Sequence, residues 1–271
     1  MSWRAKGAAT ADFAAAFLPN RVISRTTFQM MIALQVALFL LIWIRSPFAV
    51  LPRPDEVVLA LRNLWMTQGL GPELWTSIIS NFEALAITLV LSLLLSYLTV
   101  LPFWRPITAA ISKGRFLGLT GLTLIFTLIT GGGHVLKISL LVFGMTVFFV
   151  TTMSAVVAEI PKEKFDYART LRMGEWRVVW EVVVLGTADK AIEALRQNAA
   201  IGWMMLTMVE GITRSEGGVG AMLLNQNKHF HLAEVFAIQL LILLVGMGQD
   251  YGIGIAKRVL CPYAELTLER R

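Results

Sequence analysis

The sequence predicts an all-α membrane protein with about six transmembrane helices, and three observations lead to this fold class. The mean hydropathy is +0.67, only 15% of the residues are charged, and several long segments contain no charged residue at all. Soluble domains carry roughly 25% charged residues. Because lipid offers no partner to free backbone groups, apolar segments of about 20 residues are predicted to cross it as helices.

Six segments are candidates for these helices. The first four contain no Asp, Glu, Lys or Arg, whereas the last two contain charged residues and are expected to face protein or water. In chain order the six segments are residues 28–44, 84–101, 117–131, 138–158, 191–212 and 232–256.

The distribution of positive charge predicts the orientation of the chain. Most of the 24 Lys and Arg residues lie before the first candidate helix, after the second, after the fourth and after the sixth. By the positive-inside rule these segments are predicted to face the cytoplasm, so the protein is expected in the cell (inner) membrane with both termini inside. The predicted organisation is a cytoplasmic segment 1–27, a transmembrane domain 28–258 and a cytoplasmic tail 259–271. No small-residue cleavage site follows the first apolar segment, so it is expected to stay attached.

Two outer segments have recognisable local patterns. Pro52 and Pro54 end a helix, and the apolar residues between 57 and 64 follow at helical spacing, which predicts a short surface helix. Three consecutive glycines at 131–133 can adopt backbone angles that other residues avoid. A tight reversal of the chain is therefore expected there.

A charged stretch, residues 160–186, separates the fourth and fifth candidate helices. Pro161 marks the start of a short amphipathic helix, Gly174 offers a break, and a second helix from Glu175 would return the chain to the membrane. The amphipathic pattern favours a helix that lies against a surface, with the small Ala168 exposed. Composition alone equally allows a solvated connector.

This stretch resembles the EAA motif of permease subunits of type I ABC importers. That motif has an acidic residue, two small residues, three further positions and a glycine. Here Asp166, Tyr167 and Ala168 stand at its start, and Arg172 occupies the glycine position, with Gly174 two residues later. The stretch ends in Leu-Gly instead of Leu-Pro, with one residue extra.

Other segments are similar to the nitrate, sulfonate, taurine and bicarbonate branch of that family. One is the outer Leu-Pro-x-Pro segment at 51–54. Another is the glycine loop with Gly131 and Gly133, which Lys137 follows. The last is Glu210 with the Gly-aliphatic-Gly loop of Gly218 and Gly220. The resemblance extends over residues 50–258. It implies the permease fold of these importers and a small solute, such as one of these anions.

The resemblance also implies partners and a coupling mechanism. A second permease subunit, identical or a paralogue, would complete the pathway, two ATPase subunits would bind residues 163–180, and an extracytoplasmic binding protein would deliver solute. The residues expected to couple to the ATPase are Phe165, Asp166, Tyr167, Ala168, Leu171, Arg172 and Gly174. The sequence has no G-x-x-x-x-G-K-[ST] phosphate loop, so ATP and Mg²⁺ would be used by the ATPase, and no cofactor is expected in this chain.

Five charged residues lie inside the candidate helices, namely Glu193, Arg196, Glu210, Glu234 and Asp250. Glu193 and Arg196 are three residues apart and share a helix face, so they form either an internal ion pair or part of a gate or anion path. Glu210 is expected at the pathway or an interface, because of its match to the family. Asp250, near Gly246 and Gly248, is the fourth candidate for the pathway or gate, and bonding within the subunit or across a dimer is the favoured alternative for it.

Two other functions are alternatives to the permease. A stand-alone secondary transporter or channel would be expected to contain an internal repeat or several buried carboxylates. An intramembrane enzyme would need a catalytic motif, and no G-x-S-x-G or H-E-x-x-H is present. One cysteine and three histidines give no basis for a metal site, and the positions of the basic residues explain the net charge of +6 without nucleic acid.

Overall fold

The computed structural model describes residues 24–45, 48 and 50–264, and all regular elements in these ranges are helical. The fold class predicted from the sequence is therefore confirmed. The chain divides into two compact units, Met1–Leu59 and Ala60–Arg271. The predicted cytoplasmic ends fall largely on residues 1–23 and 265–271, outside the described residues.

The first unit contains α2 (Arg25–Ile44) and the beginning of α3 (Pro54–Thr67), which continues into the second unit. Ser24 caps α2 by accepting a hydrogen bond from the backbone N–H of Thr27 at 3.2 Å. Glu56 accepts from the backbone N–H of Arg53 at 3.0 Å, as in the second half of a capping box. A short helix was expected near residues 57–64, and α3 is present there.

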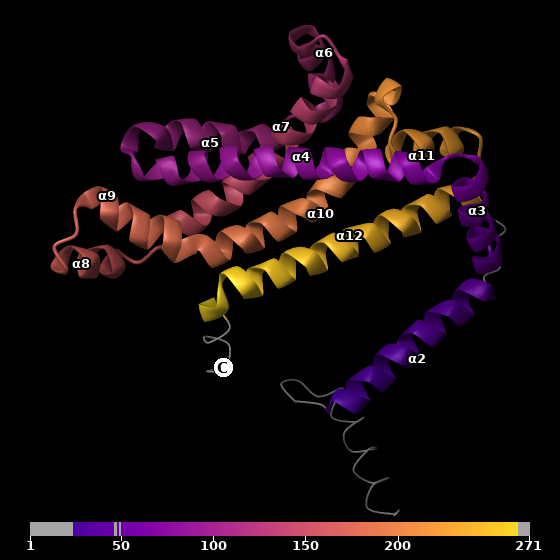
Figure 1. The fold of residues 1–271 in the computed structure, drawn as a ribbon, viewed down its shortest axis with the longest axis horizontal. Coiled ribbons are helices and arrows are strands. Elements are labelled where there is room, and N and C mark those ends of the chain that lie inside the picture. The colour runs from indigo at the N-terminus through magenta and orange to yellow at the C-terminus, as the bar shows by residue number, and fades with distance from the viewer. Residues whose placement is uncertain (1–23, 46–47, 49, 265–271) are drawn as a thin grey trace, which may run out of the picture. The chain divides into compact units, whose positions relative to one another are not determined.

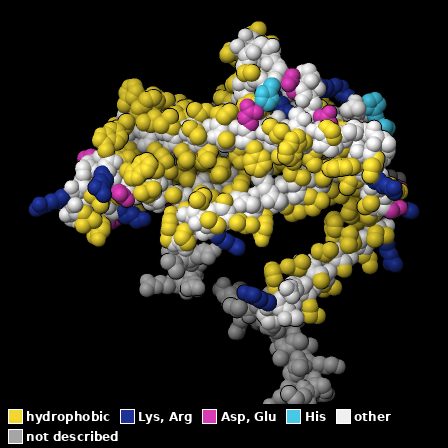
Figure 2. Space-filling model, in the orientation of Figure 1, with side chains coloured by type: hydrophobic (Ala, Val, Ile, Leu, Met, Phe, Trp, Pro, Cys, Tyr) yellow, Lys and Arg dark blue, Asp and Glu magenta, His cyan; other side chains and the backbone are white. Residues whose placement is uncertain are grey.

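The described part of the second unit contains nine further α-helices. They are α4 (Leu70–Tyr97), α5 (Arg105–Lys113), α6 (Leu119–Thr130), α7 (Gly133–Ala158), α8 (Lys162–Thr170), α9 (Glu175–Val178), α10 (Ala188–Ile212), α11 (Val219–Lys228) and α12 (Leu232–Leu260). The long helices α4, α7, α10 and α12 run lengthwise, α4 packing on α7, α7 on α10, and α10 on α12 (Figure 1). Hydrophobic side chains cover much of their visible length, and charged ones gather near α8 and α9 and near α11 (Figure 2).

Helix α7 supplies the centre of this unit. Its buried side chains are large, among them Leu140, Met145, Phe149 and Met153. The facing side of α4 is lined instead by small residues at helical spacing, namely Ser77, Ala84, Thr88, Ser92 and Ser96, all buried. Small side chains let two helix backbones approach closely, which replaces the hydrophobic driving force that lipid does not provide.

Helices α7 and α10 interlock through two glycines. A Cβ on Gly144 would lie 2.7 Å from the sulfur of Met205, and a Cβ on Gly202 would lie 2.9 Å from the sulfur of Met145. Each helix thus offers a gap that a methionine of the other fills. These two contacts fix the position of α10 along the axis of α7.

Four of the described helices are long and apolar enough to cross a membrane, namely α2, α4 with the turn that follows it, α7 and α12. The second candidate begins at Leu70 and not at residue 84. The polar side chains of Glu73, Asn81 and Glu83 interrupted the apolar pattern in the sequence. Asn81 is nevertheless buried against protein, where a polar side chain can find a partner.

The prediction of six crossing helices is not confirmed, because the third and fifth candidates differ from expectation. Helix α6 has only 12 residues, and it follows residues 102–116 across a bend of 115°. Counting that bent pair as one span gives at most five apolar candidates among the described residues. Helix α10 has 25 residues and is long enough, but its charged residues leave it outside this set.

Candidate functional site

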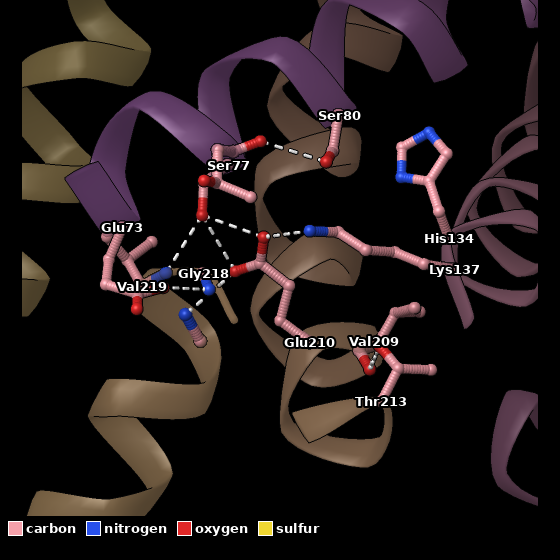
Figure 3. A network of polar contacts seen from close by, with 12 residues as sticks. Glu73, Ser77, Ser80, His134, Lys137, Val209, Glu210, Thr213, Gly218 and Val219 are labelled. Carbon is pink, nitrogen blue, oxygen red and sulfur yellow. Dashed lines mark hydrogen bonds and ion pairs between the residues drawn. The ribbon is translucent and has the colours of Figure 1, made fainter. Parts of the chain in front are cut away.

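The most completely enclosed polar cluster joins four helices at the end of the second unit where α7 begins (Figure 3). Lys137 comes from the first turns of α7, Ser77 from α4, and Glu210 from the last turn of α10. The start of α11 closes the cluster with its backbone N–H groups. Segments far apart in the sequence therefore meet at one carboxylate.

Lys137 and Glu210 form a fully buried ion pair, which we call the buried pair. The Lys137 Nζ lies 2.9 Å from Glu210 Oε1, and both side chains have 0% exposure. Ser77 Oγ lies 2.7 and 2.9 Å from the two Glu210 oxygens and donates to them, and the Gly220 N–H donates to Oε2 at 2.8 Å. Two buried charges are tolerated only when they are paired and also hydrogen-bonded, and Ser77 and Gly220 supply hydrogen bonds to the Glu210 carboxylate.

The buried carboxylate sits at the N-terminus of α11. The Val219 N–H donates to Ser77 Oγ at 2.9 Å, and the Gly218 N–H donates to Glu73. The first N–H groups of a helix have no partner within the helix and carry partial positive charge, so acidic side chains stabilise them. Glu73 and Glu210 thus serve as the caps of α11.

Glycine is required at two positions of this cap. Gly218 has φ +106, and a Cβ there would overlap the Glu210 carboxylate. A Cβ on Gly220 would lie 2.7 Å from the Thr207 Cα and overlap the Thr207 carbonyl. The Gly-aliphatic-Gly pattern in the sequence therefore has a steric cause in the contact between α10 and α11.

The structure brings together several of the residues singled out in the sequence. Glu210, Gly218, Gly220 and Lys137 meet in this one cluster, and Gly131 and Gly133, with φ +76 and +69, form the reversal before α7. The sequence did not reveal Ser77 or Glu73. Both lie in the first turns of α4, and no local pattern distinguishes them from other polar residues there.

The charged residues of α10 pair with residues of α12, and not mainly with one another as expected for Glu193 and Arg196. Arg196 donates two hydrogen bonds to Asp250, at 2.5 and 2.7 Å, and Lys257 contacts Glu193 at 2.6 Å. The expected Glu193 to Arg196 contact is present only at 3.9 Å. The closer bonds cross between helices because Asp250 and Lys257 are two turns apart on α12 and face α10.

A groove between α10 and α12 has a volume of about 500 Å³ and is lined by Trp203, Thr207, Gln239 and Asp250 among other residues. Of the four residues expected at a pathway or gate, only Asp250 belongs to its lining. The Trp203 indole N–H donates to Gln249 at 2.6 Å, so that ring is held in place beside the groove.

The charged stretch forms the helix–turn–helix expected from the sequence, with α8 followed by α9. Arg169 joins the two helices, because it donates to both carboxylate oxygens of Glu175, at 3.0 and 3.1 Å, and to Asp166 at 3.3 Å. The hydrogen bond and charge of Arg169 lower the pKa of Glu175, and the same contact raises the pKa of Arg169. The turn is thus closed by an ion pair at the surface.

Arg172 adopts a left-handed backbone conformation in this turn. Its φ is +57, in the region where glycine is favoured, and its N–H donates to the Arg169 carbonyl at 2.9 Å. Gly174 has φ −66 and precedes α9 with an extended backbone. The turn therefore bends at Arg172, and Gly174 is not the residue with unusual angles.

The exposure of the α8 side chains agrees with the sequence analysis except at Ala168. Ala168 is only 5% exposed and lines a groove between α8 and residues 181–186, so its predicted exposure was wrong. Tyr167 and Leu171 are 69% and 55% exposed, and Asp166 is also exposed, while Phe165 is partly buried. Burial of Ala168 results from the packing of α8 against the helix that follows.

The return to the membrane contains a π-helix, Val179–Val184, between α9 and α10. A π-helix bonds each N–H to the carbonyl five residues back, so one turn holds about one residue more than an α-turn. The π-helix therefore holds this extra residue without breaking the helical connection between α9 and α10.

Among residues 24–45, 48 and 50–264, no group of three or more His, Cys, Asp or Glu side chains is placed to hold a metal ion. No protein-family model and no curated protein matches the chain. Among solved structures, a chain from the MetNI methionine ABC transporter in inward-facing conformations is similar, with 20% sequence identity and a TM-score of 0.48. The match covers 77% of this chain and 97% of that chain, and a likeness at this level carries no argument for function.

Proposed function

We propose that this chain is the transmembrane permease subunit of an ATP-driven ABC importer, and that residues 163–180 bind a separate ATPase. The observation that carries the proposal is the left-handed turn at Arg172, φ +57, at the position where the EAA motif has glycine. An arginine in this conformation costs about 1–2 kcal/mol, so the turn is retained although the glycine is not.

Exposure supports the same assignment. Tyr167 and Leu171 are four residues apart on one side of α8, and both are more than half exposed. Large exposed apolar side chains rimmed by charges mark contacts with other proteins. The surface formed by Asp166, Tyr167 and Leu171, together with Arg172, is here called the coupling surface.

The coupling surface is rigidly connected to the long helices, as a segment that transmits movement from an ATPase would have to be. The two hydrogen bonds from Arg169 to Glu175 hold α8 on α9, and the π-helix joins α9 to α10 without a loop. ATP binding would draw two ATPase subunits together and move the coupling surfaces of two permeases, which exposes the pathway to alternate sides. The cytoplasmic side would then be the side of α8.

We assign the pathway to the α10–α12 groove, covered by a second permease subunit, identical or a paralogue. Trp203, Thr207 and Gln239 offer an aromatic face and neutral hydrogen-bonding groups along it. An extracytoplasmic binding protein would deliver the solute at the end of the α11 cap. The branch resemblance suggests a small anion such as nitrate, a sulfonate, taurine or bicarbonate.

The test is co-purification of the tagged chain with each ATPase and binding protein encoded in the same genome, followed by ATP hydrolysis in proteoliposomes. We expect one ATPase to co-purify and its activity to rise with a loaded binding protein. Tyr167→Ala and Asp166→Lys should abolish that stimulation, whereas Lys190→Ala, at an exposed cation of α10 outside residues 163–180, should not. Ala168→Glu is expected to uncouple as well, but through misfolding of α8, since Ala168 is buried.

Three results would contradict the proposal. They are the absence of any bound ATPase, stimulation that survives both coupling-surface variants, and uptake into proteoliposomes driven by an ion gradient without nucleotide. The last result would favour a stand-alone transporter instead.

A further inference from the structure

The segment from Pro102 to Leu117, between α4 and α6, has an unusual distribution of charge. It contains three cations, Arg105, Lys113 and Arg115, and the sequence has no Asp or Glu anywhere between residues 84 and 158. We call this segment the basic elbow, because the chain bends by 115° where it meets α6. It is a concentrated positive charge without an acidic neighbour along the chain.

The three cations also lack carboxylate partners in space. Within the part of the chain that the structure describes, the ion pairs of the second unit involve other cations, namely Lys137, Arg169, Lys190, Arg196 and Lys257, together with His134. Arg105 donates only to the Thr99 carbonyl at 3.1 Å, and the Arg115 guanidinium lies 5.1 Å from the centre of the Phe116 ring. Their positive charge therefore remains available to an external anion.

Exposed apolar side chains flank these cations. Phe103 at one end of the basic elbow is 72% exposed, Phe116 at the other is 78% exposed, and Leu117 beside it is 55% exposed. Lys and Arg next to aromatic side chains are characteristic of segments at the boundary between lipid headgroups and acyl chains. An exposed loop in water would gain nothing from three such apolar groups.

The basic elbow is held firmly against the helices of the second unit. Thr108 of α5 is buried and donates to the Leu95 carbonyl of α4 at 3.4 Å, and a Cβ on Gly114 would lie 3.1 Å from a methyl of Val147 on α7. Arg105 and Lys113, which are exposed, lie about 80° apart around α5 at 100° per residue. One side of α5 thus packs on protein, and the other presents the cations.

The position of the basic elbow fits one membrane surface. Figure 1 shows α5 alongside α4 and α7 at the end of the second unit from which α8 and α9 project. If that end is cytoplasmic, the elbow faces the leaflet that carries the anionic lipids. Long Lys and Arg side chains can reach the headgroups while their stems stay among apolar groups.

We propose that the basic elbow is a binding site for anionic phospholipid. Arg105, Lys113 and Arg115 contact the phosphates of the headgroups, and Phe103 and Phe116 insert beside the acyl chains. This inference rests on the proposed function only for the side of the membrane on which the elbow lies. The site itself requires no ATPase and no transported solute.

The first test uses native mass spectrometry of the full chain in detergent, titrated with phosphatidylglycerol or with phosphatidylcholine of the same acyl chains. We expect tighter binding of phosphatidylglycerol, and a weakening of roughly fivefold for each cation removed in Arg105→Gln, Lys113→Gln and Arg115→Gln. The matched control removes three exposed cations elsewhere, with Arg62→Gln, Arg214→Gln and Lys228→Gln. The control protein should keep the preference, and high salt should reduce it in the native protein.

The second test does not depend on the folding of the triple variant. A photo-reactive benzoylphenylalanine in place of Ala109, which is exposed between Arg105 and Lys113, would be irradiated in bilayers of both lipids. We expect adducts enriched in phosphatidylglycerol above its mole fraction. Adducts in proportion to the mole fraction, or equal losses in the triple variant and its control, would overturn the proposal while leaving ATPase coupling unaffected.

Discussion

Lys137 and Glu210 lie 2.9 Å apart with no exposed surface on either side chain, and they join α7 to α10. Glu210 in turn binds the first turn of α11 through Gly220, and Ser77 brings in α4. A single carboxylate therefore connects four helices. This carboxylate lies at the end of the second unit opposite to α8. The helices are therefore joined by a buried ion pair at one end and by exposed ion pairs at the other.

Replacing Lys137 with methionine should destabilise the protein strongly. The change leaves Glu210 buried without its counter-charge, and loss of one partner of a buried pair costs about 3–5 kcal/mol. Thermal unfolding of the detergent-solubilised protein would measure the loss. Lys113→Met, at an exposed cation, is the control and should change the free energy of unfolding by less than about 0.5 kcal/mol. If the double change Lys137→Met with Glu210→Gln were no more stable than Lys137→Met alone, the unpaired carboxylate would not be the cause.

Gly220→Ala should weaken the contact between α10 and α11. The added methyl would meet the Thr207 backbone, which cannot move aside as a flexible side chain would. Gly248→Ala on α12 is the matched control, since nothing lies within 4 Å of that position, and it should leave stability unchanged or raise it by up to about 1 kcal/mol. Hydrogen exchange of α11 would report the difference. Equal protection of α11 in both variants would contradict the steric assignment.

Arg172→Gly should stabilise the turn between α8 and α9 relative to Arg172→Ala. Glycine reaches φ +57 without strain, so the difference should be about 1 kcal/mol in favour of glycine. At Arg177, inside α9, the order should reverse, because glycine is poorer than alanine in a helix by about 1 kcal/mol. Hydrogen exchange across residues 162–180 is the measurement. A preference for alanine at both positions would mean that the turn is not left-handed.

The ion pair between Arg169 and Glu175 should make the turn sensitive to acid. Because Arg169 lowers the pKa of Glu175 below its ordinary value of 4.5, the pair stabilises the fold fully above that value. The stabilisation is lost as the pH falls through the lowered pKa of the folded protein. Carbon-13 titration of Glu175 would show this directly. Arg169→Gln should return the titration toward the ordinary range, and an unchanged titration in that variant would show that the contact is not formed in solution.

The sequence was sufficient to predict the helical class and the reversal at Gly131–Gly133, because both depend on local composition and backbone freedom. It also placed α8 and its turn. The start of α4 was missed because Glu73 and Asn81 look like loop residues until Gly218 and Gln249 are seen as their partners. The partners of Arg196 were assigned within one helix, since contacts between helices have no local signal.

The bend before α6 was missed for a related reason. Residues 117–131 form one apolar segment in the sequence, and hydropathy alone carries no information about a change of direction. Gly118 precedes α6 with φ −73 and ψ 128, an extended conformation that many residues can adopt. The bend is therefore set by how the preceding segment packs, with Thr108 bonded to Leu95 of α4 and Gly114 against Val147 of α7, and not by the chemistry of the bend itself.

The π-helical residues Val179–Val184 also determine how the coupling surface is aimed. An α-helical turn holds one residue fewer than this π-helical turn. If the segment became α-helical by loss of one residue, α8 and α9 would rotate by about 100° and shift by about 1.5 Å relative to α10. Deleting one valine of the segment would impose that change permanently. The direction in which Tyr167 and Leu171 point, relative to the long helices, thus depends on the one extra residue in the π-helical turn.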